Sequence, residues 1–271
     1  MQLRPYQRDA VDGCIASLRQ HNTSLIVMPT GTGKTVVFSE LISKASGRVM
    51  VIAHREELIT QAARKVEAVC GYRPSIEMAE LRDYGGMFGS RCVVASVQTL
   101  NAPMGDTQRR SKFNPHEFSL LVIDEAHHAV AKSYMDTINY FRRNPKLKVC
   151  GVSATPDRAD KLALGQVFED VGYKYEIFDA IDDGWLVPVV NNQVMVESLD
   201  FSHVGKSGAD LNQRDLSKVV ELESSLHGIA TPCVEIAEDR KTLLFATSVN
   251  QAHDLCAIIN RHGKKAVFVH G

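Results

Sequence analysis

The stretch SLIVMPTGTGKT, residues 24–35, decides the fold of this chain. A short apolar run leads directly into a loop that contains two glycines and ends in Lys34 and Thr35. Because Gly31 and Gly33 lack a Cβ, the backbone can take a positive φ and bring its N–H groups close to an anion. Lys34 adds a mobile positive charge, and Thr35 offers a hydroxyl to Mg²⁺. The stretch therefore predicts a phosphate-binding loop made of Pro29, Thr30, Gly31, Thr32, Gly33, Lys34 and Thr35.

The residues after the loop predict a helix whose N-terminus points at the phosphate. Apolar side chains recur there at helical spacing, at Val37, Phe38, Leu41, Ile42 and Ala45. Met28 stands where the pattern G-x-x-x-x-G-K-[ST] has its first glycine, which argues against a Ras-like GTPase or a small nucleotide kinase. The alternative is a glycine-rich turn between strand and helix, and ATP binding is the favoured interpretation.

A second acidic stretch, DEAH at residues 124–127, follows the apolar run SLLVID of residues 119–124. The run is typical of a parallel strand buried on both faces, with its carboxylates at the carboxyl edge of the sheet. We expect Asp124 to share Mg²⁺ with Thr35, and Glu125 to orient or deprotonate an attacking water. Taken alone, such acids are typical of a solvated helix start.

Three stretches together carry a family resemblance. PTGTGKT (29–35), DEAH (124–127) and SAT (153–155) resemble motifs I, II and III of superfamily 2 DNA and RNA helicases and translocases of the DEAH type. The resemblance implies a RecA-like fold that binds and hydrolyses ATP with Mg²⁺. It also implies that Ser153 and Thr155 meet His127 and couple nucleotide state to the grip on nucleic acid. Without it, the stretch is a Ser/Thr turn closed by Pro156.

The N-terminal LRPYQ, residues 3–7, resembles the family's adenine-reading Q motif. The resemblance implies that Gln7 pairs with the edge of the base and that Arg4 packs on its face, and a Gln amide has both the donor and the acceptor needed. The alternative is an amphipathic helix with Pro5 in its first turn.

Further resemblances imply nucleic-acid contacts at the ends of two other strands and in the C-terminal part of the chain. The residues are His54 and Arg55 (motif Ia), Ser96, Gln98 and Thr99 (motif Ib), and Thr247 (motif IV). Such side chains suit phosphates, which position a strand without reading its sequence. Arg55 paired with a surface acid, and Ser96, Gln98 and Thr99 as helix caps, are the alternatives. The basic cluster Arg109, Arg110 and Lys112 is expected to be solvated, and a place along the nucleic acid is the alternative.

Five strand-like segments alternate with helical ones, which predicts an α/β fold with a twisted, mainly parallel sheet covered by helices. We expect a RecA-like domain over residues 1–198, with a strand at 189–196, a connector over 199–223, and the beginning of a second RecA-like domain over 224–271. Strands are predicted at 241–246 and 265–269 on either side of a helix capped by Ser248. Motifs V and VI, with the arginine that crosses to the γ-phosphate, have no counterpart, so weak hydrolysis is expected.

Composition narrows the class of protein. The chain has 271 residues, 44% of them hydrophobic and 23% charged, and a formal net charge of -1, so any nucleic-acid contact must come from a local patch. Six cysteines without a C-x-x-C pair and ten histidines without metal-ligand spacing predict no structural zinc. No apolar run reaches the roughly 18 residues of a membrane span, so we expect a cytoplasmic protein without a membrane partner. Oligomeric state is left open.

The predicted function is an ATP-dependent helicase or translocase that acts on nucleic acid. DNA is favoured over RNA because AHREEL (53–58) and ATPDR (154–158) resemble DNA repair and restriction-type translocases, RadD-like proteins among them, more than DEAD-box RNA helicases. The alternatives are an RNA helicase and a nucleotide-gated nucleic-acid binding module without motor activity. A metabolic phosphate-loop kinase would need an Arg-rich lid, and the sequence has no segment suited to one.

Overall fold

The computed structural model describes residues 2–81, 90–154, 164–208 and 210–270. The chain forms two compact units, unit 1 (Met1–Pro188) and unit 2 (Val189–Gly271), which are considered one at a time. No helix in the described ranges combines the length and the apolar character needed to cross a bilayer.

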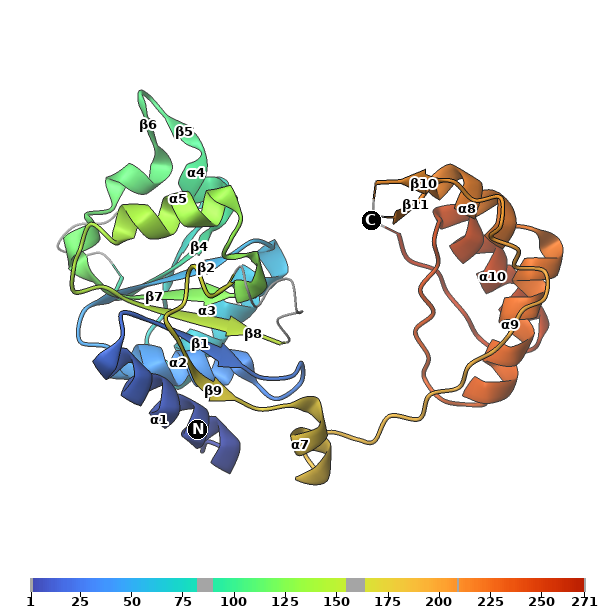
Figure 1. Ribbon diagram of the computed structural model, residues 1–271, viewed down its shortest axis with the longest axis horizontal. Helices are drawn as coiled ribbons and strands as arrows, with labels where there is room; N and C mark the ends of the chain where they lie inside the picture. Colours follow the sequence, from blue (N-terminus) through green and yellow to red (C-terminus); the bar gives the residue numbers. More distant parts are fainter. Residues whose placement is uncertain (1, 82–89, 155–163, 209, 271) are drawn as a thin grey trace. The chain divides into compact units, whose positions relative to one another are not determined.

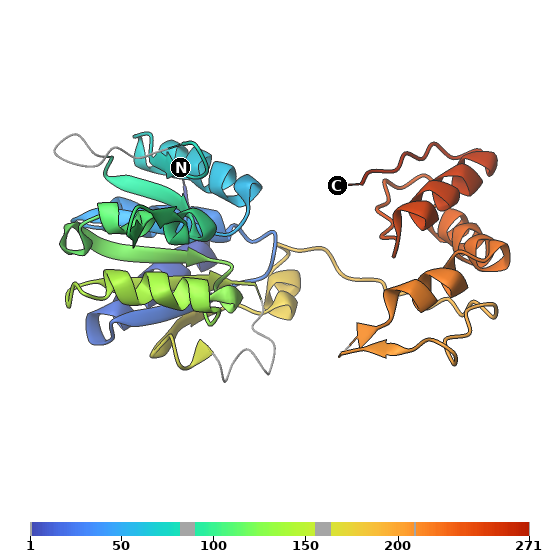
Figure 2. The same cartoon turned by 90° about the horizontal axis from the view of Figure 1, so that it is seen from above.

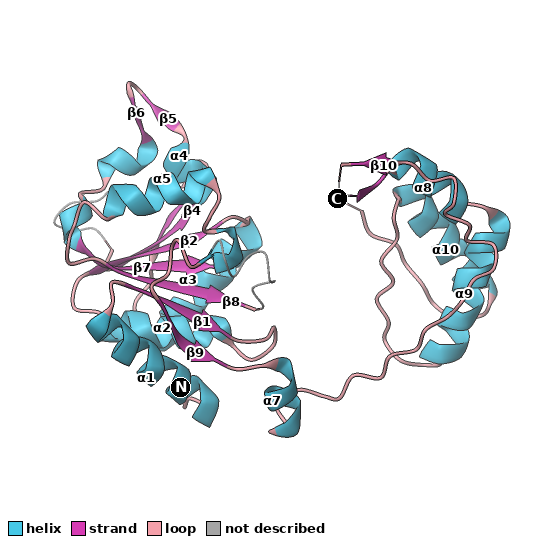
Figure 3. Cartoon of the chain, in the orientation of Figure 1, coloured by secondary structure: helices cyan, strands magenta, loops and turns pink. Residues whose placement is uncertain are grey.

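Unit 1 is built on a seven-stranded sheet in which every neighbouring pair is parallel (Figures 1 and 3). The spatial order is β3-β4-β2-β7-β8-β1-β9. The strands are β1 (Thr23–Val27), β2 (Arg48–Ala53), β3 (Ser75–Glu77), β4 (Cys92–Ser96), β7 (Phe118–Asp124), β8 (Lys148–Ser153) and β9 (Asp170–Lys174). Because all of them run the same way, the residues that follow each strand meet at one edge of the sheet.

Helices cover both faces of this sheet, as Figure 2 shows. One face packs against α1 (Pro5–Gln20), α2 (Lys34–Lys44) and α3 (Glu56–Cys70), and the other against α4 (Val97–Asn101) and α5 (Lys132–Phe141). The strand β7 shows why: Leu120 and Val122 lie in the first core, whereas Leu121 and Ile123 lie in the second. A strand buried on both faces needs such an uninterrupted apolar run. The predicted α/β fold with a mainly parallel sheet is confirmed.

Shorter elements complete unit 1. They are the hairpin β5 (Pro103–Met104) with β6 (Thr107–Gln108), the 3₁₀ helices η2 (Arg109–Lys112), η3 (Pro115–Glu117) and η4 (Ala126–His128), and α7 (Ile177–Asp182). The edge strands β3 and β9 were not predicted, because both are short and carry polar residues or glycine.

The prediction of a solvated basic cluster at residues 109–112 is wrong. Arg109 and Lys112 both pair with Glu77, a carboxylate with no exposed surface at the end of β3. Arg110 donates to Asn101 Oδ1 and lies over the ring of Tyr140. A buried carboxylate requires partners of opposite charge, and these cations supply them.

Unit 2 contains three helices, α8 (Gln213–Val220), α9 (Glu223–Ala237) and α10 (Val249–Arg261), and the hairpin β10 (Lys206–Ser207) with β11 (Asp210–Leu211). The hairpin and α8 fall inside the stretch predicted as a connector. Ser248 caps α10 as predicted, since its Oγ accepts a hydrogen bond from Gln251 N at 3.0 Å. The small core consists of Leu226, Ala230, Leu255 and Ile258.

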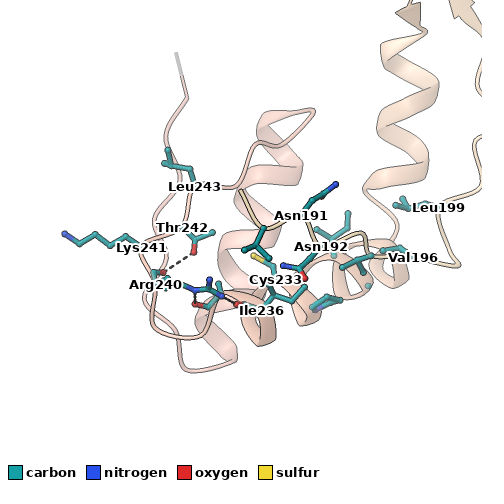
Figure 4. A pocket seen from close by; sticks show the side chains of 16 residues that line it. Asn191, Asn192, Val196, Leu199, Cys233, Ile236, Arg240, Lys241, Thr242 and Leu243 are labelled. Atoms are coloured by element: carbon teal, nitrogen blue, oxygen red, sulfur yellow. Dashed lines mark hydrogen bonds between the residues drawn. The ribbon is translucent and has the colours of Figure 1, made fainter. Parts of the chain in front are cut away.

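The strands predicted at 189–196, 241–246 and 265–269 are not formed in unit 2. Their apolar side chains point outward: Leu243 is 87% exposed and Phe245 is 92% exposed. Two of these segments line a pocket beside α9 (Figure 4) with residues such as Asn191, Val196, Cys233 and Thr242. A strand needs a hydrogen-bonded neighbour, and the described part of unit 2 offers these segments none.

Candidate active site

The predicted phosphate-binding loop joins β1 to α2 and has the backbone that its glycines predict. Gly31 and Gly33 both have φ of 87°, in the left-handed region, and Gly33 is the N-cap of α2. Thr32 Oγ1 donates to the Pro29 carbonyl at 2.7 Å, which holds the loop closed. Lys34 Nζ reaches back to the Met28 carbonyl at 3.4 Å. The loop therefore keeps its N–H groups and its lysine at the carboxyl edge of the sheet.

The residues of the predicted adenine-reading motif lock onto this loop. Gln7 Nε2 and Tyr6 Oη both donate to the Thr32 carbonyl, at 2.9 and 2.8 Å. Gln7 Oε1 accepts from Arg4 N at 3.0 Å. A Cβ on Gly33 would lie 2.6 Å from Gln7 Nε2, so a side chain there would push the amide away. The residues predicted to read the base and those predicted to bind phosphate thus form one connected structure.

The acidic pair ends β7 at the same edge of the sheet. Asp124 is 6% exposed, and burial together with the neighbouring Glu125 charge raises its pKa to about 6. Its Oδ1 accepts the Glu125 N–H at 3.0 Å, and Glu125 itself has φ of 51°, a left-handed conformation that is rare for a non-glycine residue. Strain of this kind clusters at functional sites.

Lys34 and the acidic pair lie close enough to interact. Burial lowers the pKa of Lys34, whereas the charges of Glu125 and Asp124 raise it. The charge of Lys34 in turn lowers the pKa of Asp124. In the fold, only β8 separates β7 from β1, and all three strands end on the same side. Two stretches that are ninety residues apart in the sequence (124 minus 34) therefore meet in one place.

His127, the histidine of the acidic motif, connects this motif to β8, the neighbouring strand of the sheet. His127 Nδ1 lies 3.3 Å from Ser153 Oγ, at the end of β8, and 3.4 Å from Glu125 Oε2. Ser153 is fully buried. Thr155, the other predicted coupling residue, lies outside the described residues. The structure thus places Ser153 beside His127 and links both to Glu125.

The predicted motif Ia residues lie at the end of β2, next to the acidic motif. The ring of His54 packs edge-on against His128 at 4.5 Å, and the His128 ring lies 4.1 Å from that of His127. Burial lowers the pKa of His54 and of His128, which favours their neutral forms. His54 Nδ1 is buried without a hydrogen-bond partner among the described residues. Arg55 is exposed at the N-cap of α3.

The motif Ib residues have structural contacts of their own. Ser96 caps α4 through Thr99 N at 3.4 Å, and Thr99 Oγ1 accepts from Ala79 N. Gln98 is exposed, and its Nε2 donates to the His54 carbonyl at 3.1 Å. Ser96 is therefore the N-cap of α4, which matches the predicted alternative, whereas Thr99 lies inside α4 and holds Ala79. Gln98 joins this region to His54. In unit 2, Thr247 is exposed and donates through Oγ1 to Gln251 Oε1.

Sequence reasoning missed three residues near the site. His128 bridges His54 and His127, and Tyr134, on α5, has a buried hydroxyl without a hydrogen-bond partner among the described residues. Burial and the charges of Asp124 and Glu125 raise the pKa of this hydroxyl. Trp185 lies 4.6 Å from the Arg4 guanidinium. Only Trp185 carried a signal, as the single tryptophan of the chain.

The donors at this edge fit a magnesium ion held mainly by a nucleotide. Thr35, in the first turn of α2, would offer a hydroxyl, and Asp124, at the end of β7, a carboxylate. The described residues contain no group of three or more His, Cys, Asp or Glu side chains arranged for a metal. Mg²⁺ typically takes one or two carboxylates and completes its shell with waters and phosphates.

Comparison with known proteins finds relatives among ATP-dependent helicases and DNA translocases. The family described as type III restriction enzyme, res subunit, matches residues 1–158. The ATP-dependent helicase IRC3 of Saccharomyces cerevisiae is 33% identical over 270 residues, which cover 93% of this chain and 37% of IRC3. The DNA 3'-5' translocase XPB2 of Sulfurisphaera tokodaii is 26% identical over 160 residues, 59% of this chain and 32% of that protein. The chain thus spans well under half the length of these relatives.

A solved structure extends the likeness to the fold of nearly the whole chain. A variant of Dbp5 from S. cerevisiae, bound to RNA and ADP BeF3, matches with a TM-score of 0.58 at 16% identity. The match covers 97% of this chain and 66% of the Dbp5 chain. At this identity the likeness shows a shared RecA-like fold.

Proposed function

The chain belongs to the family described as type III restriction enzyme, res subunit, and from this premise we propose that it is the ATP-binding part of an ATP-dependent superfamily 2 helicase or nucleic-acid translocase. The observation that carries the proposal is the convergence of Lys34 with Asp124 and Glu125 at one edge of the sheet. A phosphate loop alone is compatible with many nucleotide-binding proteins. The loop together with a buried carboxylate and a second, strained one is what phosphoryl transfer requires.

Each residue of the site has a distinct role in this proposal. Lys34 and the loop N–H groups bind the β- and γ-phosphates, and Thr35 and Asp124 hold Mg²⁺. The ion, when bound with the nucleotide, neutralises charge that develops on the phosphate oxygens. Glu125 orients the attacking water and accepts its proton. His127, together with Ser153 and Thr155, couples the nucleotide state of the site to the grip on nucleic acid. Arg4 and Gln7 bind the adenine.

We assign the nucleic-acid contacts to His54, Arg55 and Gln98 in unit 1 and to Thr247 in unit 2. DNA is favoured over RNA because the matching family is named for restriction enzymes and a relative is named as a DNA translocase. The DEAH-box type, a cytoplasmic location, and the division into residues 1–198, 199–223 and 224–271 remain parts of the same proposal.

The decisive experiment compares two lysines of one helix. Lys34→Ala is expected to weaken Mg·ATP binding about 100-fold or more, because it removes a charge-assisted contact to phosphate. Lys44→Ala is the matched control, since Lys44 ends the same helix and pairs only with Glu40, at 3.1 Å on the surface. Isothermal titration calorimetry measures both. Equal ATP affinity in the two variants would contradict the proposal.

A second experiment separates a motor from a nucleotide-gated binding module. In the full-length protein, Glu125→Gln is expected to keep ATP binding but to slow turnover by about 10² to 10⁴. ATPase rates are then compared with duplex DNA, single-stranded DNA and RNA. Stimulation by RNA alone would overturn the preference for DNA, and nucleic-acid binding that responds to ATP without any turnover would identify the binding module.

A further inference from the structure

The turn that ends unit 1 holds Trp185 and Leu186 in fixed positions. After α7 the chain turns at Gly184, whose φ is 74°. The N–H groups of Trp185 and of Leu186 then both donate to the Ala180 carbonyl, each at 2.9 Å. Two adjacent side chains are thereby anchored to one helix end, although no motif of the sequence includes them.

This turn lies directly against the proposed nucleotide site. The Leu186 side chain would be 3.5 Å from a Cβ placed on Gly31 of the phosphate loop. The indole of Trp185 lies 4.6 Å from the Arg4 guanidinium and meets Tyr6 edge-on at 5.5 Å. The turn therefore contacts both the phosphate loop and the residues proposed to bind the base.

A rigid aromatic cluster supports Trp185. Tyr6 stacks on Tyr175 with ring centroids 4.8 Å apart and planes 15° apart. The Tyr175 hydroxyl donates to Asp183 Oδ2 at 2.7 Å, and its N–H donates to the Val27 carbonyl at the end of β1. Tyr6 is tied to the loop through Thr32. Because Tyr6 is tied to the loop and Tyr175 to the end of β1, the cluster gives Trp185 a firm support.

The Arg4 guanidinium packs over Trp185, while the residue as a whole remains exposed. Trp185 covers one side, and a guanidinium N–H donates to Tyr6 Oη at 3.2 Å. A planar guanidinium can stack on two flat groups at once, one on each side. The face opposite Trp185 is therefore the one on which a purine can stack when its phosphates lie in the loop.

We propose that Trp185 is a positioning residue of the base site: it backs the Arg4 guanidinium, so that the adenine of the nucleotide stacks on the opposite face. This inference rests on the proposed ATP binding and adds a residue that determines affinity for the base. Gln7, whose amide joins Arg4 N to the Thr32 carbonyl, fixes Arg4 relative to the loop. Trp185 thus acts on the base and leaves the binding of the phosphates unchanged.

The test uses probes that contain or lack a base. Trp185→Ala is expected to weaken ATP binding about tenfold, while the affinity for inorganic tripolyphosphate changes less than twofold. Trp185→Phe restores ATP affinity to within about threefold of the natural chain, because a second aromatic ring still backs Arg4. Phe178→Ala is the control: Phe178 lies on α7 and is 72% exposed, so its removal leaves both affinities unchanged.

Tryptophan emission gives an independent readout that needs no variant. Trp185 is the single tryptophan, so ATP is expected to change the emission and tripolyphosphate to leave it unchanged. This measurement decides the matter even if Trp185→Ala fails to fold. If the chain binds ATP through Lys34 but Trp185→Ala lowers ATP and tripolyphosphate affinity equally, or the emission responds to both probes alike, the inference is overturned. Absence of any Lys34-dependent ATP binding overturns instead the proposed function on which it rests.

Discussion

Two segments of similar composition, one in each unit, differ in whether they form a strand. RVMVIA forms β2 of unit 1, where it pairs with β4 on one side and β7 on the other and its last five residues have no exposed surface. KTLLFA, residues 241–246 of unit 2, forms no strand and exposes Leu243 and Phe245 almost completely. An apolar, β-prone run therefore becomes a strand only where neighbours are present to receive its hydrogen bonds and cover its side chains.

Helix formation depends less on distant partners than strand formation does. α10 forms in unit 2 under the same local signals that shape the helices of unit 1, because a helix satisfies its hydrogen bonds within itself. The comparison thus separates structure that depends on local sequence from structure that depends on distant partners. Four measurements test this separation, and they are given in order of decreasing effect.

Hydrogen exchange should show the largest contrast. Amides of β2 are expected to exchange at least about 10³-fold more slowly than those of residues 243–245, because central strands open only with the whole domain. Exchange followed by mass spectrometry on the same sample measures both peptides. Equal protection of the two peptides would show that 241–246 has a strand partner after all.

Truncating one phenylalanine in each unit should give the next largest difference. Phe141, on α5, has no exposed surface, so Phe141→Ala is expected to lower the free energy of unfolding of unit 1 by about 3 to 5 kcal/mol. Phe245→Ala should change that of unit 2 by less than about 0.5 kcal/mol. Urea unfolding followed by circular dichroism measures both, with Trp185 emission identifying the transition of unit 1. A large loss from Phe245→Ala would end the contrast.

Asp124 contributes to the free energy of unfolding of unit 1. This contribution depends on pH with the opposite sign to that of the acids in unit 2 whose pKa is shifted. The pKa of Asp124 is raised from 3.8 to about 6 by burial and by Glu125, so the native state binds this proton more tightly than the unfolded chain. Stability from this group is full below about pH 4 and is lost as pH rises to about 6, a difference of about 3 kcal/mol. In unit 2, hydrogen bonds from Ser202, Lys218 and Lys264 lower the pKa of Asp200, Asp215 and Asp239.

Without Mg²⁺ and nucleotide, Asp124→Asn is therefore expected to stabilise unit 1 above pH 6 and to have little effect below pH 4. Asp106→Asn, in the exposed turn of the β5–β6 hairpin, is the control and should follow the natural chain at every pH. Thermal unfolding at several pH values gives the comparison. A stabilisation by Asp124→Asn that does not change with pH would show that the Asp124 charge is not its cause.

The smallest effect concerns a helix cap. Ser248→Ala removes the acceptor for Gln251 N and is expected to destabilise α10 by about 1 kcal/mol, an effect confined to unit 2. Ser248→Thr keeps both the acceptor for Gln251 N and the hydroxyl that donates to Glu221, so it should retain most of the stability. Helix content by circular dichroism during urea unfolding reports both variants. No loss in Ser248→Ala would indicate that packing against α9, rather than the cap, sets this boundary.

The sequence predicted those parts of the site whose signal lies within one short stretch of residues. The phosphate loop, the acidic motif and the strands that precede them were found because spacing and apolar runs carry the signal. The contact between Glu77 and Arg109, the His54–His128 pair and the Trp185–Arg4 stack were not found. The paired residues are 32, 74 and 181 positions apart in the sequence, respectively, and no sequence pattern predicts these contacts. Unit 2 was predicted with strands because the sequence marks β-prone runs but not their missing neighbours.

The place of β1 in the sheet has a consequence for synthesis on the ribosome. Its two neighbours are β8 and β9, so the strand that precedes the phosphate loop has both partners only when Lys174 has been made. At about 5 to 20 residues per second, the roughly 150 residues in between take about 8 to 30 seconds. Until then β1 is paired on one side at most, and the loop at its end lacks one of the two strands that hold it in the folded chain.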